Sequence, residues 1–130
     1  MRTIEKLSSE KCLIEESRKG IDKSVIIEIL KQANLSLNEL ASYLHVSTRM
    51  IQKKANNDLF PPPVSEHALY IARLYLIGRR IFGSNKRFIG WMETENISLG
   101  GVKPKTYLDT YSGIQLLINK INGIAHGFPA

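Results

Sequence analysis

The segment that follows Ser65 constrains the fold most, because it is apolar on almost every face of the helix that it predicts. The predicted helix ends at Phe82, just before Gly83. A helix that is apolar all round lies at the centre of a bundle or in an interface between subunits. We therefore expect this helix to be central to the fold. Its apolar positions are Leu69, Ile71, Ala72, Leu74, Leu76, Ile77 and Ile81.

Helical spacing of apolar residues and helix-start signals recur along much of the chain. No run alternates apolar and polar residues as a strand would, so the expected fold is all-α. The first twenty residues show no clean period, which leaves an arm and a short helix open. Helices are predicted at about 22–32, 36–44, 47–55, 85–93 and 112–122, with a further helix beginning at Pro104 and Gly123 ending the last one.

Three consecutive prolines, at positions 61–63, predict a boundary within the chain. Proline removes a backbone donor and clashes with the preceding turn, so residues 56–65 are not expected to be helical. The expected organisation is an N-terminal arm (1–20), a helix-turn-helix DNA-binding domain (21–60) and a C-terminal helical domain (65–130). The net charge of +6 divides into +2 up to Ser65 and +4 after it, so charge does not locate a binding site.

The composition favours a cytoplasmic protein with an anionic partner. The single cysteine, Cys12, cannot form an internal disulfide, and the N-terminus lacks the apolar core of a signal peptide. The most apolar stretch, 68–82, contains three arginines and is too short to span a bilayer. A basic chain favours nucleic acid first and an acidic protein surface second.

Residues 37–54 have the spacing of a DNA-binding helix-turn-helix. Leu37, Leu40 and Leu44 form the inner stripe of a first helix, and Ile51 returns a second helix onto it. His45 occupies the turn, where glycine is usual, but histidine tolerates a left-handed backbone better than most residues. A plain helical hairpin with a solvated polar face is the alternative. The candidate DNA-binding residues on the outer face are Ser47, Thr48, Arg49, Gln52, Lys53 and Lys54, whose side chains suit base edges or phosphates.

No residue pattern predicts catalysis, a cofactor or a metal site. The sequence lacks a carboxylate pair, a thiol–histidine pair and a glycine-rich phosphate loop, so an enzyme is not expected. His45 and His67 do not have the spacing of metal ligands. Trp91 is expected to supply packing area, and Gly100-Gly101 to form a turn that needs unusual backbone angles.

A series of short motifs in the C-terminal half resembles the toxin-binding domain of Xre/MbcA/ParS-type antitoxins, the partners of RES-domain toxins. Upstream, residues 46–53 (VSTRMIQK) are similar to the recognition helix of the same family, with Met50 where threonine is expected. The resemblance covers about residue 22 to the C-terminus. The motifs are Phe82-Gly83, Trp91-Met92, Ile97-Ser98-Leu99-Gly100-Gly101, Lys103-Pro104, Gly113 and Ile124-Ala125-His126-Gly127.

The resemblance implies an antitoxin without catalysis or cofactor, whose C-terminus blocks the active-site entrance of a toxin that consumes NAD⁺. It also implies binding to the operon's own promoter. A stand-alone regulator with a C-terminal dimerisation domain is the alternative, and a frayed terminus is the alternative for the tail. We expect a homodimer, with part of the 68–82 helix or the N-terminal arm at the interface. The candidate toxin-binding residues are Lys120, Asn122, His126, Gly127, Phe128, Pro129 and Ala130.

Overall fold

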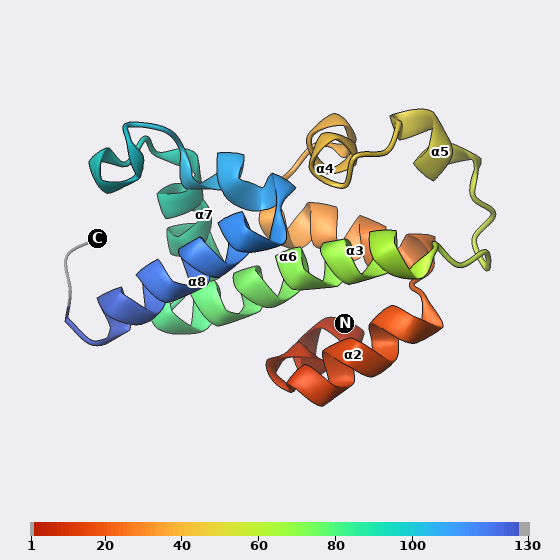
Figure 1. The fold of residues 1–130 in the computed structure, drawn as a ribbon, viewed down its shortest axis with the longest axis horizontal. Helices are drawn as coiled ribbons and strands as arrows, with labels where there is room; N and C mark the ends of the chain where they lie inside the picture. The colour runs from red at the N-terminus through yellow and green to blue at the C-terminus, as the bar shows by residue number, and fades with distance from the viewer. Residues whose placement is uncertain (1, 128–130) are drawn as a thin grey trace.

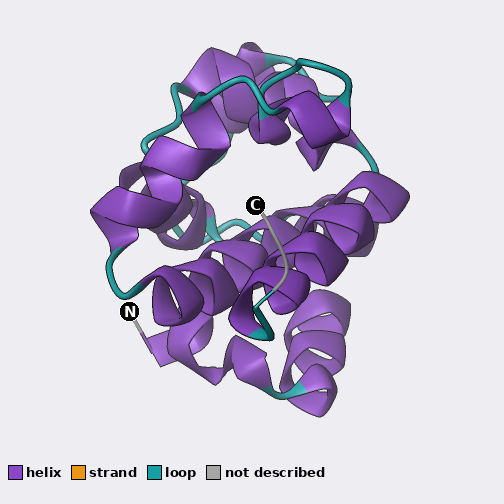
Figure 2. Cartoon of the chain, turned by 90° about the vertical axis from the view of Figure 1, so that its left-hand side faces the viewer, coloured by secondary structure: helices purple, strands orange, loops and turns teal. Residues whose placement is uncertain are grey.

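The computed structural model describes residues 2–127 as helices packed around one long helix. Within these residues the only strand-like pairing is an antiparallel bridge between Asn96 and Val102, and Figure 2 shows helices joined by loops. The predicted all-α fold is confirmed. The elements are α1 (Arg2–Glu5), the 3₁₀ helix η1 (Lys6–Ser8), α2 (Glu10–Lys19), α3 (Lys23–Ala33), α4 (Leu37–Tyr43), α5 (Thr48–Lys53), α6 (Pro62–Phe82), α7 (Asn85–Glu93), the 3₁₀ helices η2 (Ile97–Leu99) and η3 (Pro104–Asp109), and α8 (Tyr111–Ala125).

Helix α6 is the centre of the molecule. It runs through the middle of Figure 1, and α2, α3, α7 and α8 pack against it. Leu69, Ile71 and Leu74 have no exposed surface, so the apolar faces of α6 are covered by the chain itself. The prediction of a central helix is confirmed. The fully buried positions are not available to a subunit interface, whereas Ile77 and Ile81 of the same helix are only partly buried, so the homodimer stays a prediction.

The start of α6 differs from the prediction, because the helix begins at Pro62 and includes the residues up to Ser65. The first backbone N–H groups of a helix have no acceptor within it, so prolines are tolerated in the first turn. The buried Ser65 hydroxyl reinforces this start. Its Oγ accepts a hydrogen bond from the Ile21 N–H at 3.0 Å and donates to the Phe60 carbonyl at 3.1 Å.

The first twenty residues, which the sequence left open between an arm and a short helix, form α1, η1 and α2. The hydroxyl of Ser9 caps α2 by accepting a hydrogen bond from the Cys12 N–H at 3.3 Å. Ile4, Leu7 and Leu13 are buried, and all three of these elements contact α6. The N-terminal residues therefore belong to the common core.

The end of α8 also differs from the prediction, because Gly123 does not end the helix and α8 continues to Ala125. A glycine within a helix costs only about 1 kcal/mol relative to alanine. Ile124 packs against the hydrophobic core immediately after it, which favours another half turn of helix.

Candidate functional site

Helices α4 and α5 form the predicted helix-turn-helix, and local capping determines where each begins. Ser36 and Glu39 form a reciprocal capping box at α4, with N–O distances of 3.0 and 3.1 Å. The hydroxyl of Ser47 accepts from the Met50 N–H at 3.0 Å and caps α5. Between them His45 has φ 60°, the left-handed conformation that the sequence predicted for this turn.

The outer side of α5 presents three predicted DNA-binding side chains to solvent. Arg49, Gln52 and Lys53 are exposed, and they project from a helix whose Ile51 is buried against the core. Three nearby donors and acceptors on a short exposed helix can contact base edges and phosphates in a major groove.

The other predicted DNA-binding residues have structural contacts as well. Ser47 is the cap of α5, and Thr48 is only partly exposed. Lys54 donates from Nζ to the Leu59 carbonyl at 3.2 Å and lies 5.4 Å from the ring centroid of Phe60. Lys54 is therefore engaged with its own chain at the end of the helix.

A residue that the sequence did not single out, Lys23, holds α5 in place. Its Nζ atom donates to the carbonyl oxygens of Gln52 at 3.0 Å and Lys54 at 3.2 Å. A cation is favourable at a helix C-terminus, where carbonyl groups lack intrahelical partners. Lys23 belongs to α3, so this contact fixes α5 relative to α3.

In the C-terminal half a tight turn connects α7 to η3. The N–H groups of Leu99 and Gly101 donate to the Asn96 carbonyl at 3.0 and 2.9 Å. The Asn96 side chain accepts from the N–H and the hydroxyl of Ser98 at 2.9 and 2.6 Å. Gly100 and Gly101 have φ 82° and 84°, which confirms the predicted turn and its backbone requirement.

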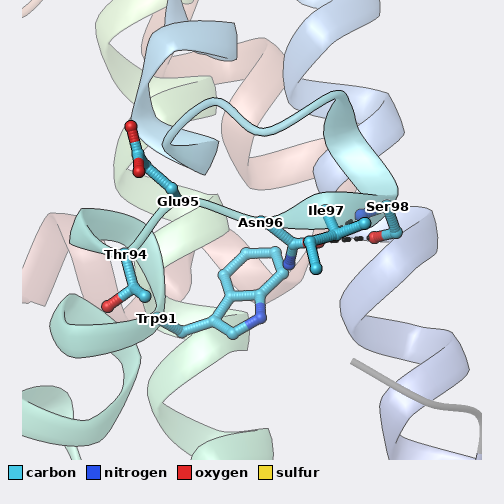
Figure 3. A pocket seen from close by; sticks show the side chains of 6 residues that line it. All are labelled: Trp91, Thr94, Glu95, Asn96, Ile97 and Ser98. Carbon is cyan, nitrogen blue, oxygen red and sulfur yellow. Dashed lines mark hydrogen bonds between the residues drawn. The ribbon is translucent and has the colours of Figure 1, made fainter.

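Beside this turn lies an open hollow of about 490 Å³, lined by residues of α7 and of the turn (Figure 3). The Trp91 indole lies beneath the Asn96–Ile97 segment, while the Glu95 carboxylate points away from it. Trp91 packs against Phe82 and Phe88, at ring-centroid distances of 5.7 and 6.0 Å, so it supplies packing area as expected.

Two family models match the chain in succession. Residues 13–73 match the antitoxin Xre-like helix-turn-helix domain, and residues 78–127 match the antitoxin Xre/MbcA/ParS C-terminal toxin-binding domain. The chain belongs to this antitoxin family. It is an Xre-type antitoxin of a toxin–antitoxin system, with a DNA-binding half and a toxin-binding half. No curated protein matches the chain significantly.

The predicted toxin-binding residues that the structure describes lie in or just after the second half of α8. Lys120 donates from Nζ to the Ser98 hydroxyl at 2.8 Å, which connects α8 to the tight turn. Asn122 and His126 are exposed, and Gly127 has φ 89°. The remaining predicted residues, Phe128, Pro129 and Ala130, lie outside the described part of the chain.

The two halves of the antitoxin are joined by partly buried polar contacts that sequence reasoning missed. Lys105 of η3 lies 2.6 Å from Glu39 of α4 and 2.8 Å from Glu93 of α7. Burial lowers the pKa of Lys105, but its hydrogen bonds to both carboxylates raise the pKa by more, above its ordinary value. The hydrogen bond from Lys105 also lowers the pKa of Glu39. Lys105 is therefore charged and shared between the two halves.

Among the described residues, no helix is long and apolar enough to cross a membrane. The same residues contain no group of three or more histidine, cysteine, aspartate or glutamate side chains that could hold a metal ion. His45 and His67 instead contact backbone carbonyl groups of η3, as described below.

Proposed function

We propose that this antitoxin neutralises a RES-domain toxin that consumes NAD⁺, by placing its C-terminal segment, from His126 onward, in the entrance of the toxin's active site. In this proposal the antitoxin contributes no catalytic step and binds no cofactor. The proposal goes beyond the family assignment, which gives a toxin-binding domain at residues 78–127 without naming the toxin.

The observation that carries the proposal is the way in which α8 is anchored and then ends. Ile114, Leu117 and Ile121 are at most 1% exposed, so the inner face of the helix is fixed to the core. Immediately after the helix, His126 and Gly127 are exposed. A segment that starts there begins from a rigid base, and it carries no charged side chain except His126 when protonated. Backbone carbonyl groups of such a segment can accept hydrogen bonds from the donors that line a phosphate-binding site.

Removing residues 126–130 tests the proposal, because α8 remains whole to Ala125. The truncated antitoxin should keep its melting temperature and promoter binding but lose neutralisation, measured as NAD⁺ loss and growth arrest when it is produced with the toxin. Lys86→Ala, at an exposed position of α7, is the matched variant in the body of the domain and should neutralise nearly as well as the intact chain. If the truncated chain protects cells fully, the C-terminal segment does not block the toxin.

We further propose that the antitoxin binds the promoter of its own operon as a homodimer, through α5 of each copy. Support for a dimer comes from the two-fold symmetry of most helix-turn-helix sites. The partly buried Ile77 and Ile81 of α6 and the exposed Ile14 of α2 are candidates for the interface. Promoter and NAD⁺ are both cytoplasmic, so we place the antitoxin there. Light scattering tests the dimer, and a monomeric mass with and without DNA would contradict it.

A further inference from the structure

The most exposed large apolar side chain of the described residues belongs to the tight turn beside the hollow. Ile97 is 94% exposed, and Val102, across the bridge from Asn96, is 40% exposed. A single exposed apolar residue on a flexible loop needs no explanation. Ile97 differs because the turn that carries it is held by the hydrogen bonds around Asn96.

The turn is also fixed to the neighbouring elements. The Tyr107 hydroxyl donates to the Leu99 carbonyl at 3.3 Å, and the Leu99 side chain is buried. Lys120 connects Ser98 to α8 at 2.8 Å. The chain therefore holds Ile97 in one position in solvent, so an Ile97 contact with a partner would not require ordering of the turn.

The hollow below Ile97 is lined by the Trp91 side chain. The indole Nε1 atom is buried with no acceptor among residues 2–127. Buried indole N–H groups usually have a partner, because an unpaired buried donor costs free energy. A partner that brings an apolar side chain would fit the exposed apolar surface of Ile97 and Val102 beside this hollow.

We propose that Ile97, Val102 and the Trp91 hollow form an apolar anchor for the toxin, separate from the C-terminal segment that blocks its active site. The anchor lies within the matched toxin-binding domain, and Lys120 joins it to the helix from which the C-terminal segment begins. The toxin is thus the partner that this surface is placed to meet. The inference rests on the proposed function in one respect, which is that the C-terminal segment blocks the active site while the anchor does not.

In this arrangement the two contacts have different tasks. The anchor provides affinity, since a rigid apolar side chain at the centre of an interface carries a large share of binding energy. The C-terminal segment provides inhibition. Truncation and anchor variants should therefore separate binding from neutralisation.

The test is the affinity of full-length Ile97→Glu for a catalytically inactive variant of the cognate toxin, measured by calorimetry. We expect the affinity to fall by a factor of about ten or more, as for a residue at the centre of an interface. Ile97→Ser should show a smaller loss in the same direction. Trp91→Phe keeps a ring but reduces the apolar area that lines the hollow and should lose affinity to a lesser extent. Ile27→Glu, at a 46% exposed position of α3 outside the toxin-binding domain, is the matched control and should bind normally.

Each outcome decides the inference independently of the blocking mechanism. Unchanged toxin affinity in Ile97→Glu, with an unchanged melting temperature, overturns it. The inference is also overturned if Ile97→Glu changes only the mass of the free antitoxin, because Ile97 would then contact a second copy. It is likewise overturned if Ile97→Glu changes only promoter binding, because Ile97 would then contact DNA. The chain lacking residues 126–130 should still bind the inactive toxin within a few-fold through the anchor. If that chain still neutralises while Ile97→Glu does not bind, the blocking mechanism fails and the anchor stands.

Discussion

The Nζ atom of Lys105 lies 2.6 Å from the Oε2 atom of Glu39, which joins the toxin-binding half of the antitoxin to the first helix of the helix-turn-helix. The Lys105 side chain is 15% exposed and the Glu39 side chain 33%. Glu39 also caps α4 through the Ser36 N–H. One carboxylate thus caps the first helix of the helix-turn-helix and contacts the other half of the protein.

Replacing Lys105 with methionine should lower the free energy of unfolding. The aliphatic stem is kept, but Glu39 and Glu93 lose their shared cation and repel each other. Breaking a buried pair costs about 3–5 kcal/mol, and partial exposure of both carboxylates reduces the expected loss to roughly 1–3 kcal/mol. Urea unfolding at pH 7 measures this loss of stability. Lys103→Met, at an exposed position of the same segment, is the control and should change the free energy of unfolding by less than about 0.5 kcal/mol.

The contribution of the Lys105–Glu39 pair should depend on pH in a defined direction. The pKa of Glu39 is lowered from its ordinary value of 4.5, so the folded state favours the carboxylate. The stabilisation is present above pH 4.5 and is lost as the pH falls through the lower folded pKa. The difference in stability between the intact chain and Lys105→Met should therefore shrink in acid; a constant difference would contradict the ion-pair explanation.

His67 should make the antitoxin less stable below pH 6.5. Its side chain is 7% exposed, and Nε2 lies 2.8 Å from the Leu108 carbonyl, so the neutral ring donates there. Burial lowers the pKa of His67 from its ordinary value of 6.5, and repulsion from His45 lowers it further. The hydrogen bond to the Leu108 carbonyl and the negative charge of Asp109 raise the pKa, but by less. A lowered histidine pKa gives stability that is present above pH 6.5 and is lost as the pH falls toward the folded pKa. The loss between pH 6.5 and 5.5 should be at most about 1 kcal/mol.

The matched variant for this prediction is His67→Gln, which keeps a side-chain N–H donor but does not titrate. Its unfolding free energy should change less than that of the intact chain between pH 6.5 and 5.5, whatever its stability at pH 7. His45, whose ring lies 5.9 Å from that of His67 and whose Nε2 lies 2.8 Å from the Asp109 carbonyl, provides a second comparison through His45→Gln. Equal slopes in the intact chain and His67→Gln would assign the acid sensitivity to other groups.

The parts of the fold that the sequence predicted are those determined by neighbouring residues. Ser36 and Ser84 begin α4 and α7 through hydrogen bonds within three residues, and Gly83 ends α6 with φ 88°. The two boundary errors have different causes. Pro62 lies in the first turn of a helix, where proline is tolerated. Gly123 lies inside a helix because Ile124 beside it packs against the core, which outweighs the low helix propensity of glycine.

The candidate site was less accessible to sequence reasoning than the fold. Periodicity identified the exposed face of α5, because burial of Ile51 fixes which side points outward. It did not identify Lys23, which is 29 residues from Gln52 in the chain, or Lys105, which is 66 residues from Glu39. Such contacts depend on how helices pack, and a basic residue in the sequence gives no sign of its partner.

Replacing Arg49 and Gln52 with alanine should weaken specific promoter binding while toxin binding stays intact. Both side chains are exposed on α5, and each good base contact contributes about 1–3 kcal/mol. Fluorescence anisotropy with the promoter and with an unrelated duplex measures the specific part. Arg87→Ala removes one positive charge from an exposed position of α7 and serves as the control. A double variant that binds the promoter as tightly as the intact antitoxin would show that α5 does not read bases.

The last prediction concerns two helical glycines with opposite surroundings. Gly78 of α6 is in contact with the Phe88 ring, so a Cβ atom there would overlap it, whereas a Cβ atom at Gly90 of α7 would meet nothing within 4 Å. Alanine favours a helix by about 1 kcal/mol over glycine. Gly90→Ala should therefore raise the free energy of unfolding by roughly 0.5–1 kcal/mol.

At Gly78 the same substitution should be destabilising. Phe88 has no exposed surface and packs against Tyr75 and Phe82 at ring-centroid distances of 5.2 and 5.3 Å, so it has no room to move away. Overpacking costs about 1–3 kcal/mol, which offsets or exceeds the gain in helix propensity. Urea unfolding of both variants gives the comparison, and Gly78→Ala should be less stable than Gly90→Ala by at least about 1 kcal/mol. Equal stabilisation by the two alanines would mean that α6 and α7 are not packed as closely as this contact requires.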